Sequence, residues 1–464
     1  MVQDWSGKRV LIIGAARQGL ALTRYLSRHD AEVTLTDSRP EAQLAEVMHS
    51  LTDIPVRWAV GGHPFELLDD KDLICISGGV PLTTPIVIEA QNRQIPLSND
   101  SQLFMEACPC RVVAITGSAG KTTTTALLGN IAKTHMEIKN SRGRAWVGGN
   151  IGNPLIDQID EIEADDIAIL ELSSFQLEIM SISPDVAAVL NITPNHLDRH
   201  GSMQAYTAAK ARILAYQNSN DTAILNRDDK GSWNLTRDVK ANLLSFGIKA
   251  PLHYMDGTYL KNDHIFLQVN GEQIKLLPTE WIKLRGEHNL HNVLAACAIA
   301  AGASLVLPAI GQAVDDFTGV PHRLELVRSF KGIDWYDDSI ATAPERTMAA
   351  IRSFDDPLVL LLGGRDKDLP WEDLANLTKQ RVNHLIVFGE AADKILNTLG
   401  PPEIGRRPFT ITRCDGLKQA VQTAAKIAKP DDVVLLSPGG TSFDEFKDFE
   451  ERGKWFQTWV MELS

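Results

Sequence analysis

Short apolar runs alternate with amphipathic segments along most of the chain, and this pattern predicts an α/β protein. The runs 8–13, 112–115, 167–170 and 358–362 are rich in Val, Ile and Leu and end at Gly or polar residues. Such runs are typical of buried parallel strands, and the segments between them suit crossover helices. The pattern therefore predicts open, doubly wound α/β sheets.

Two changes of composition divide this pattern into three stretches. A chain of 464 residues is long enough for about three domains. The first predicted boundary is at Cys108-Pro109-Cys110-Arg111, and the second is near Gly319-Val320-Pro321. We expect a Rossmann-like N-terminal domain at 1–108, a central P-loop ATPase-like domain at 109–319 and a Rossmann-like C-terminal α/β domain at 320–464.

The bulk composition favours a globular protein of a reducing compartment. Hydrophobic residues make up 44% of the chain, and no run of about 18 apolar residues is present. The N-terminus lacks a basic and then apolar signal segment, and the five cysteines form no CxxC pair. A net charge of −13 disfavours non-specific nucleic-acid binding. We expect a cytoplasmic protein with no nucleic-acid partner and no membrane insertion.

The segment 116–123, TGSAGKTT, predicts a phosphate-binding loop between a strand and a helix. Its glycines let backbone N–H groups approach phosphate oxygens, Lys121 supplies a charge, and Thr122 offers a hydroxyl to Mg²⁺. Ile115 stands where the full Walker pattern has Gly, so this is a shortened form. The alternative is a glycine turn with a surface lysine. The residues expected at the ATP phosphates are Gly117, Ser118, Ala119, Gly120, Lys121, Thr122 and Thr123.

Polar residues follow the next two strands of the central domain. Glu171 ends the run 167–170, a place where a carboxylate usually holds Mg²⁺, although a chance strand-end Glu is the alternative. His196 and His200 are four residues apart but lack the HExxH pattern, so we interpret their loop as a substrate and phosphate loop. In the helix predicted at 202–217, Lys210 lies among alanines, which is typical of a solvated position.

Further polar residues suit nucleotide contacts. Asn289 and Asn292 lie on one face of a predicted helix and could contact adenine, although helix capping is an equal alternative. In the first domain, Asp37 ends the second predicted strand, and Ser77 follows another. These positions suit ligand contact, but Asp37 could simply begin a turn. Ala16 interrupts the GxGxxG fingerprint, which disfavours a dehydrogenase.

Three loops of the third domain follow predicted strands and should therefore gather at one edge of a sheet. They are 337–342, 363–367 and 437–442. Thr342 with Glu345, and Ser442 with Glu445, also fit helix capping boxes. Capping alone could explain both hydroxyl residues and does not exclude ligand contact.

The motifs together are those of a known family. TGSAGKTT, GGNIGNP, ELSSFQLE, NITPNHLDRH, AAKARI, GEHNLHNVLAA, PHRLE, DDS and LSPGGTSFDEF occur in this order over residues 112–450. The chain resembles the Mur ligases, which are ATP-dependent, amide-forming enzymes of peptidoglycan synthesis. ELSSFQLE, the chain length and the first domain are most similar to the branch that adds D-glutamate to UDP-N-acetylmuramoyl-L-alanine. The resemblance implies one domain each for the UDP-sugar, ATP and the amino acid, and we expect a monomer.

The resemblance also implies a role for each matching position. The catalytic residues would be Lys121, Glu171, His196 and Lys210. Two Mg²⁺ ions would be held by Thr122, Glu171, His196 and Lys210, the last carbamylated by CO₂. ATP would also contact Asn289, Asn292, Arg323 and Asp338. The UDP-linked substrate would contact Gly14, Asp37, Ser77, Asn150 and His196. Glutamate would contact Thr342, Lys367, Ser442 and Phe449.

Two departures from the family pattern lie in the third domain. Ile340 replaces the usual Lys of the DSKAT-type motif, and Gly439-Gly440-Thr441 replaces the ACAS-type segment before Ser442. A sister ligase that adds L-glutamate is therefore an alternative, and a nucleotide-binding regulator without turnover is another. Lys121, Glu171 and Lys210 argue against the regulator.

Overall fold

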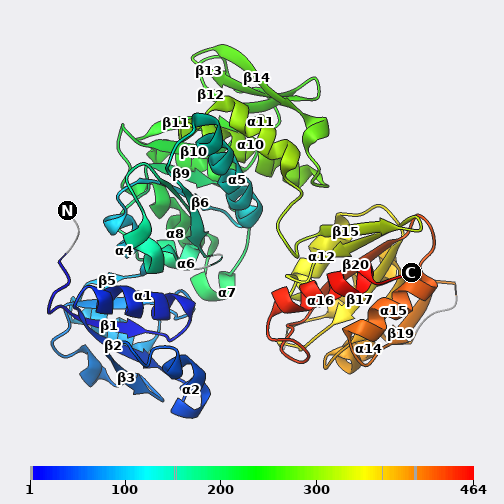
Figure 1. Ribbon diagram of the computed structural model, residues 1–464, viewed down its shortest axis with the longest axis horizontal. Coiled ribbons are helices and arrows are strands. Elements are labelled where there is room, and N and C mark those ends of the chain that lie inside the picture. The colour runs from blue at the N-terminus through cyan, green and yellow to red at the C-terminus, as the bar shows by residue number, and fades with distance from the viewer. Residues whose placement is uncertain (1–3, 151, 153, 368, 402–404) are drawn as a thin grey trace. The chain divides into compact units, whose positions relative to one another are not determined.

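The computed structural model describes residues 4–150, 152, 154–367, 369–401 and 405–464. Their backbone forms two compact units. Unit 1 comprises Met1–Lys283 and Glu287–Phe317, and unit 2 comprises Leu284–Gly286 and Thr318–Ser464. Unit 1 holds two sheets and unit 2 holds one, which Figure 1 colours in sequence from blue to red.

The first sheet of unit 1 is a five-stranded parallel sheet in the order β3-β2-β1-β4-β5. Its strands are β1 (Arg9–Ile13), β2 (Glu32–Asp37), β3 (Val56–Val60), β4 (Leu73–Ile76) and β5 (Leu97–Ser98). Its helices are α1 (Arg17–Arg28), α2 (Glu41–His49), α3 (Pro85–Asn92) and α4 (Asp100–Ala107), with the short η1 (Phe65–Leu68). The strand order reverses between β1 and β4, which is where open α/β sheets bind ligands.

The second sheet has nine strands in the order β14-β13-β12-β11-β10-β9-β6-β8-β7. The parallel strands are β6 (Arg111–Thr116), β7 (Ala145–Gly149), β8 (Ile167–Glu171), β9 (Val186–Val189), β10 (Thr222–Asn226), β11 (Asn242–Phe246) and β12 (Asp256–Lys261). The antiparallel strands β13 (His264–Val269) and β14 (Glu272–Pro278) extend it. Its longer helices are α5 (Lys121–Lys139), α8 (Met203–Ala215), α10 (Glu287–Gly302) and α11 (Leu307–Asp316).

The short helices of unit 1 lie in the loops that follow the strands. They are η2 (Leu155–Glu161), α6 (Ser174–Leu177), α7 (Leu197–His200), α9 (Lys230–Trp233), η3 (Asn234–Asp238) and η4 (Thr279–Trp281). α1 and α4 pack against η2, where Arg24 and Arg28 form ion pairs with Asp157. The buried side chains of these elements belong to one hydrophobic core, so the first two sheets form one unit.

Unit 2 is a six-stranded sheet in the order β15-β16-β20-β17-β18-β19, in which only β15 is antiparallel. Its strands are β15 (Glu325–Phe330), β16 (Ile333–Asp337), β17 (Leu358–Gly363), β18 (Val382–Phe388), β19 (Thr410–Arg413) and β20 (Val433–Gly439). Its helices are α12 (Pro344–Arg352), α13 (Glu372–Arg381), α14 (Ala392–Leu399), α15 (Leu417–Ile427) and α16 (Phe449–Met461). Leu358, Leu360 and Leu362 face the core under α12–α14, while Val359 and Leu361 face the core under α15 and α16.

These three sheets confirm the predicted α/β fold class. All five cysteines are free thiols. No helix among the described residues is long and apolar enough to cross a membrane.

The two predicted capping boxes are wrong. α12 begins after Ala343, whose side chain makes no capping bond, because Pro344 sets the first helical position. No helix starts at Ser442, and α16 instead begins after Asp448, which accepts a bond from the Glu451 N–H. The Glu445 carboxylate accepts a hydrogen bond from the Leu417 N–H, at the start of a different helix.

Candidate active site

The phosphate-loop sequence lies between β6 and α5, as predicted. Gly120 precedes α5 with a φ of 82°, a left-handed conformation that favours glycine. A Cβ at Gly120 would lie 2.2 Å from Oδ1 of Asn292, so the first turn of α5 and α10 approach closely there. The Lys121 ammonium folds back and donates to the Gly117 carbonyl over 2.8 Å.

Asn191 holds this loop in place, and sequence reasoning missed it. Its side-chain oxygen accepts from the Ala119 N–H over 2.8 Å, and its amide group donates to the Ala119 carbonyl over 3.0 Å. Its own carbonyl accepts from the Ser118 N–H. Asn191 follows β9, the strand paired in parallel with β6, and that strand-end position was the available signal.

Glu171 is a buried carboxylate at the end of β8, which pairs with β6. Its Oε1 accepts from Nδ2 of Asn150 over 3.1 Å, and its backbone carbonyl accepts from the Asn150 N–H. Its buried Oε2 has no hydrogen-bond partner among the described residues. Gly149 has a φ of 98°, and a Cβ there would lie 2.4 Å from the Glu171 carbonyl oxygen. A buried carboxylate oxygen of this kind is the ligand that Mg²⁺ prefers.

Lys210 is buried, with 1% of its surface exposed. The alanines around it in the sequence had predicted a solvated helix residue instead. Its ammonium donates to the Gly117 carbonyl over 2.9 Å and to Oγ1 of Thr116 over 3.3 Å, and it lies over the Tyr206 ring. Burial and then the charge of Lys121 lower the pKa of Lys210 to about 7, against an opposing effect of Glu171. The lysine is therefore a group that changes its charge near neutral pH.

His196 lies on the chain just before α7 and contacts the ring of Phe175 at a centroid distance of 5.3 Å. Phe175 also stacks on His200 and carries the Arg199 guanidinium over its face at 4.4 Å. His200 pairs with Ser174 through Nε2. The loop 193–200 and α6 therefore pack together directly after Glu171.

The predicted substrate residues of the first sheet gather at the carboxyl ends of β1, β2 and β4. The Ser77 hydroxyl donates to the Gly14 carbonyl over 2.8 Å. The Asp37 carboxylate accepts from the Ala15 N–H and from the Arg39 guanidinium, which holds the pKa of Asp37 far below its usual range. Asp37 thus orders the loop 14–19.

A pocket joins this edge to the central sheet. It is lined by Ser77 and Gly78, which follow β4, and by Phe175, Gln176 and Arg199 from α6 and α7. Asn150 is bonded to Glu171, and two residues further along the same loop the Gly152 carbonyl accepts from the Arg17 guanidinium of α1 over 3.1 Å.

Asn289 and Asn292 lie in the first turns of α10, as predicted. The Asn292 amide donates to Oδ1 of Asn289 over 3.0 Å. With Asn292 against Gly120, this pair lies beside the phosphate loop. The structure therefore brings together Lys121, Lys210, Glu171 and the asparagine pair within unit 1.

In unit 2, Asp338 follows β16 and is buried. It accepts hydrogen bonds from the Ser437 hydroxyl over 2.7 Å and from the Leu324 N–H over 3.3 Å. Burial raises the pKa of Asp338 to about 7, although Ser437 and the charge of Arg323 oppose this. The charge of Arg323 therefore acts on the Asp338 carboxylate.

The three loops of unit 2 gather at one sheet edge, as predicted. The Gly439 N–H donates to the Ala341 carbonyl, and Arg365 and Thr441 exchange two backbone hydrogen bonds. Ser442 is buried and Thr342 is half-buried, whereas Lys367 is exposed. Although Lys367 reaches the surface, partial desolvation by its neighbours and the charges of Arg346 and Arg452 lower its pKa. Phe449 begins α16, and its carbonyl accepts from the Ser339 hydroxyl.

Comparison with known proteins connects this geometry to one family. Residues 8–99 match the family model of the Mur ligase MurD-like N-terminal domain, residues 115–300 the Mur ligase middle domain, and residues 322–440 the Mur ligase glutamate ligase domain. The UDP-N-acetylmuramoylalanine--D-glutamate ligase of Koribacter versatilis is 38% identical over 99% of both chains. The enzyme of the same name from Symbiobacterium thermophilum is 37% identical over 98% of both.

Solved structures show the same fold at lower identity. The UDP-N-acetylmuramate-alanine ligase of Thermotoga maritima has a TM-score of 0.58 and 18% identity over 98% of this chain and 99% of that one. A pseudomurein peptide ligase type C from Methanothermus fervidus has a TM-score of 0.55 and 18% identity over 99% and 100%. With a phosphate loop, a buried strand-end carboxylate and full-length similarity in three domains, the chain belongs to the Mur ligase family of ATP-dependent, amide-forming ligases.

Proposed function

We propose that this chain joins D-glutamate to UDP-N-acetylmuramoyl-L-alanine at the expense of ATP, as a cytoplasmic monomer in peptidoglycan precursor synthesis. The observation that carries the proposal is the convergence of Lys121, Lys210 and Glu171 on the phosphate loop. The choice of substrates follows relatives named UDP-N-acetylmuramoylalanine--D-glutamate ligase, which match at 34% to 38% identity over nearly the whole chain.

Mg²⁺ fits the residues around Glu171. Oε2 of Glu171 is buried without a hydrogen-bond partner among the described residues, and an uncompensated buried carboxylate is costly. We assign Thr122, Glu171, His196 and modified Lys210 as ligands of two Mg²⁺ ions. When bound, the ions offset the negative charge that gathers as phosphate is transferred.

Carbamylation of Lys210 fits its surroundings. With a pKa of about 7, a large share of Lys210 is neutral at physiological pH. The neutral amine attacks the carbon of CO₂, a C–N bond forms, and one proton leaves to solvent. The product is an anion, so a lysine that repels Lys121 becomes a ligand that attracts cations.

The remaining residues divide among the three substrates. ATP contacts residues 117–123, Asn289, Asn292, Arg323 and Asp338. The UDP-linked substrate contacts Gly14, Asp37, Ser77, Asn150 and His196. Glutamate contacts Thr342, Lys367, Ser442 and Phe449. The pocket next to Ser77 and Arg199 supports the second assignment, and the gathered loops of unit 2 support the third.

The reaction follows from these contacts in two steps. A carboxylate oxygen of the UDP-linked substrate attacks the γ-phosphorus of ATP, which gives an acylphosphate and ADP. The glutamate nitrogen then attacks the acyl carbon, loses a proton and expels inorganic phosphate, which leaves an amide. Lys121, whose ammonium lies at the Gly117 carbonyl of the phosphate loop, would stabilise charge on the transferred phosphate.

Phosphate release tests the proposal when one substrate is omitted at a time. Release should require ATP, Mg²⁺, UDP-N-acetylmuramoyl-L-alanine and D-glutamate together. Faster product formation with L-glutamate would favour the sister ligase, for which the observation is Ile340 in place of a lysine. Nucleotide binding without phosphate release under any combination would favour the regulator and contradict the proposal.

A further inference from the structure

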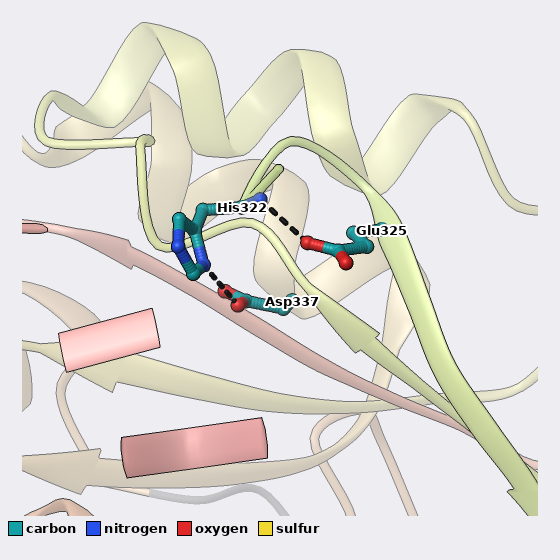
Figure 2. A group of neighbouring side chains, drawn as sticks. All are labelled: His322, Glu325 and Asp337. Atoms are coloured by element: carbon teal, nitrogen blue, oxygen red, sulfur yellow. Dashed lines mark hydrogen bonds and ion pairs between the residues drawn. The ribbon is translucent and has the colours of Figure 1, made fainter. Parts of the chain in front are cut away.

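His322 lies near the start of unit 2 in an unusual conformation. Its φ is 61°, in the left-handed region that few non-glycine residues adopt. The side chain is buried, and Figure 2 shows its ring beside Asp337 while its backbone nitrogen faces Glu325. Its Nδ1 is 2.7 Å from Oδ2 of Asp337, and its backbone N–H donates to Oε2 of Glu325 over 2.7 Å. Two specific contacts therefore compensate the strained backbone.

The same carboxylates receive a second set of donors from α16. The Gln457 amide nitrogen is 3.0 Å from Oε2 of Glu325 and 3.0 Å from Oδ2 of Asp337. The atoms that could otherwise bind a metal ion are thus already paired with N–H donors. The cluster is a hydrogen-bonded network, and we do not assign a cation to it.

The carboxylates around His322 oppose the effect of burial on its pKa. Burial alone would lower its pKa, but the hydrogen bond and charge of Asp337, together with Glu325 and Glu450, raise the pKa of His322 above its ordinary value. An imidazolium held by one carboxylate is a stronger and more directional contact than a neutral pair.

The ring also fixes the position of α16. A Cβ at Gly453 would lie 2.1 Å from Nδ1 of His322, so the ring packs directly on the backbone of this helix. The ring of Phe449, the first residue of α16, meets His322 edge to face at 6.5 Å. His322 is therefore fixed against the helix that begins at a proposed glutamate contact.

On its other side, His322 is next to the proposed nucleotide contacts. His322 and Arg323 are consecutive, and so are their partners Asp337 and Asp338. The His322 carbonyl also accepts from the Ile340 N–H over 3.1 Å. Two neighbouring residues of one turn thus pair with two neighbouring residues at the end of β16.

We propose that His322 is a positioning residue that holds the nucleotide contacts Arg323 and Asp338 and the start of α16 at Phe449 in one arrangement. The inference rests on the proposed function. One imidazole supports both groups, so its loss should weaken ATP and glutamate together. The UDP-linked substrate, whose proposed contacts lie in unit 1, should bind as before.

The experiment measures KM for all three substrates and kcat in the full-length enzyme. His322→Ala should raise KM for ATP and for D-glutamate by roughly tenfold each, the size expected when a buried, charge-assisted hydrogen bond is lost. KM for the UDP-linked substrate should stay within about twofold, because its proposed contacts lie in unit 1. A loss of folded enzyme alone would lower kcat and change no KM, so a joint rise of two KM values has another cause.

His322→Asn provides a test of rescue. Asparagine tolerates the left-handed conformation and retains an N–H donor for Asp337, so both KM values should return to within about threefold of wild type. His384→Asn is the matched control and should leave all constants unchanged. His384 lies on β18, where its ring contacts Thr410 and Phe409, and neither residue is a proposed substrate contact.

The outcomes separate this inference from the proposed function. Wild-type turnover in the same assay tests the function itself. An unchanged KM for either ATP or D-glutamate in His322→Ala would overturn the role of His322 while the function stands. If His322→Ala does not fold, Asp337→Asn removes the charge of the partner carboxylate at constant size. A rise of KM for both ATP and D-glutamate in Asp337→Asn would then support the role of His322, and an unchanged KM for either would overturn it.

Discussion

Lys121 and Lys210 donate hydrogen bonds to the same acceptor, the carbonyl oxygen of Gly117, over 2.8 and 2.9 Å. Two ammonium groups at one oxygen repel each other, and this repulsion contributes to the lowered pKa of Lys210. The repulsion is relieved when phosphate arrives or when one lysine loses its positive charge. The loop is thus prepared for an anion before the anion binds.

Lys121→Ala should abolish catalysis without unfolding the protein. The side chain is half-buried at the start of α5, and its loss would remove the charge that we propose faces the transferred phosphate. Phosphate release should fall by about 100-fold or more. Thermal unfolding should stay close to wild type, and Lys133→Ala, an exposed position of the same helix, is the control. ATP turnover near the wild-type rate would show that this loop does not bind the reacting nucleotide.

Lys210→Ala should be nearly inactive, by about 100-fold or more, because a metal ligand would be lost. A short carboxylate such as acetate should restore part of the activity by occupying the place of the carbamate. Lys230→Ala, at an exposed site, should behave as wild type with and without acetate. Full activity of Lys210→Ala would refute the assigned role, and mass spectrometry of the wild type under CO₂ checks the modification.

Glu171→Gln should separate metal binding from folding. The change removes a buried charge whose Oε2 has no partner among the described residues, so the metal-free protein should be no less stable. The Mg²⁺ concentration for half-maximal activity should rise by about tenfold or more. The stabilisation of wild type by Mg²⁺ in thermal unfolding should disappear. Glu163→Gln, at an exposed turn, is the control and should keep the Mg²⁺ dependence of activity and the stabilisation by Mg²⁺ of wild type. An unchanged Mg²⁺ response in Glu171→Gln would exclude Glu171 as a ligand.

Asp338→Asn should flatten the pH dependence of stability. The pKa of Asp338 is raised from 3.8 to about 7 by burial, so between these pH values the folded protein binds one proton more than the unfolded chain. Its contribution to the free energy of unfolding is therefore fully present below pH 3.8 and is lost as pH rises to about 7.

The slope from this one group approaches about 1.4 kcal/mol per pH unit. Thermal unfolding of both proteins across this pH range checks it, since other groups cancel in the difference. A constant difference between wild type and Asp338→Asn at all pH values would contradict the shifted pKa.

The sequence predicted the parts of this enzyme that depend on local pattern. β6, the loop 117–120 and α5 follow from an apolar run, glycines and a helical segment, each of which acts within a few residues. The gathering of loops in unit 2 follows from the rule that parallel strands end at one edge. These inferences required no knowledge of side-chain contacts.

Contacts between distant segments were harder to predict. Lys210 lies among alanines, which suggested solvent, yet it shares a helix face with buried Tyr206 and Leu214. The helical spacing was the better signal there. Asn191 bonds Ala119 across 72 positions, and Glu445 bonds Leu417 across 28, so neither pairing is visible in a local motif.

The close packing around Gly120 and Gly149 limits how this protein can change. A side chain at Gly120 would collide with Asn292 at 2.2 Å, and one at Gly149 would collide with the Glu171 carbonyl at 2.4 Å. Both glycines also have positive φ angles, so each substitution is disfavoured twice. Selection for activity among random variants should therefore recover almost no side chain at either position, so these two glycines mark the part of the phosphate site least able to diverge.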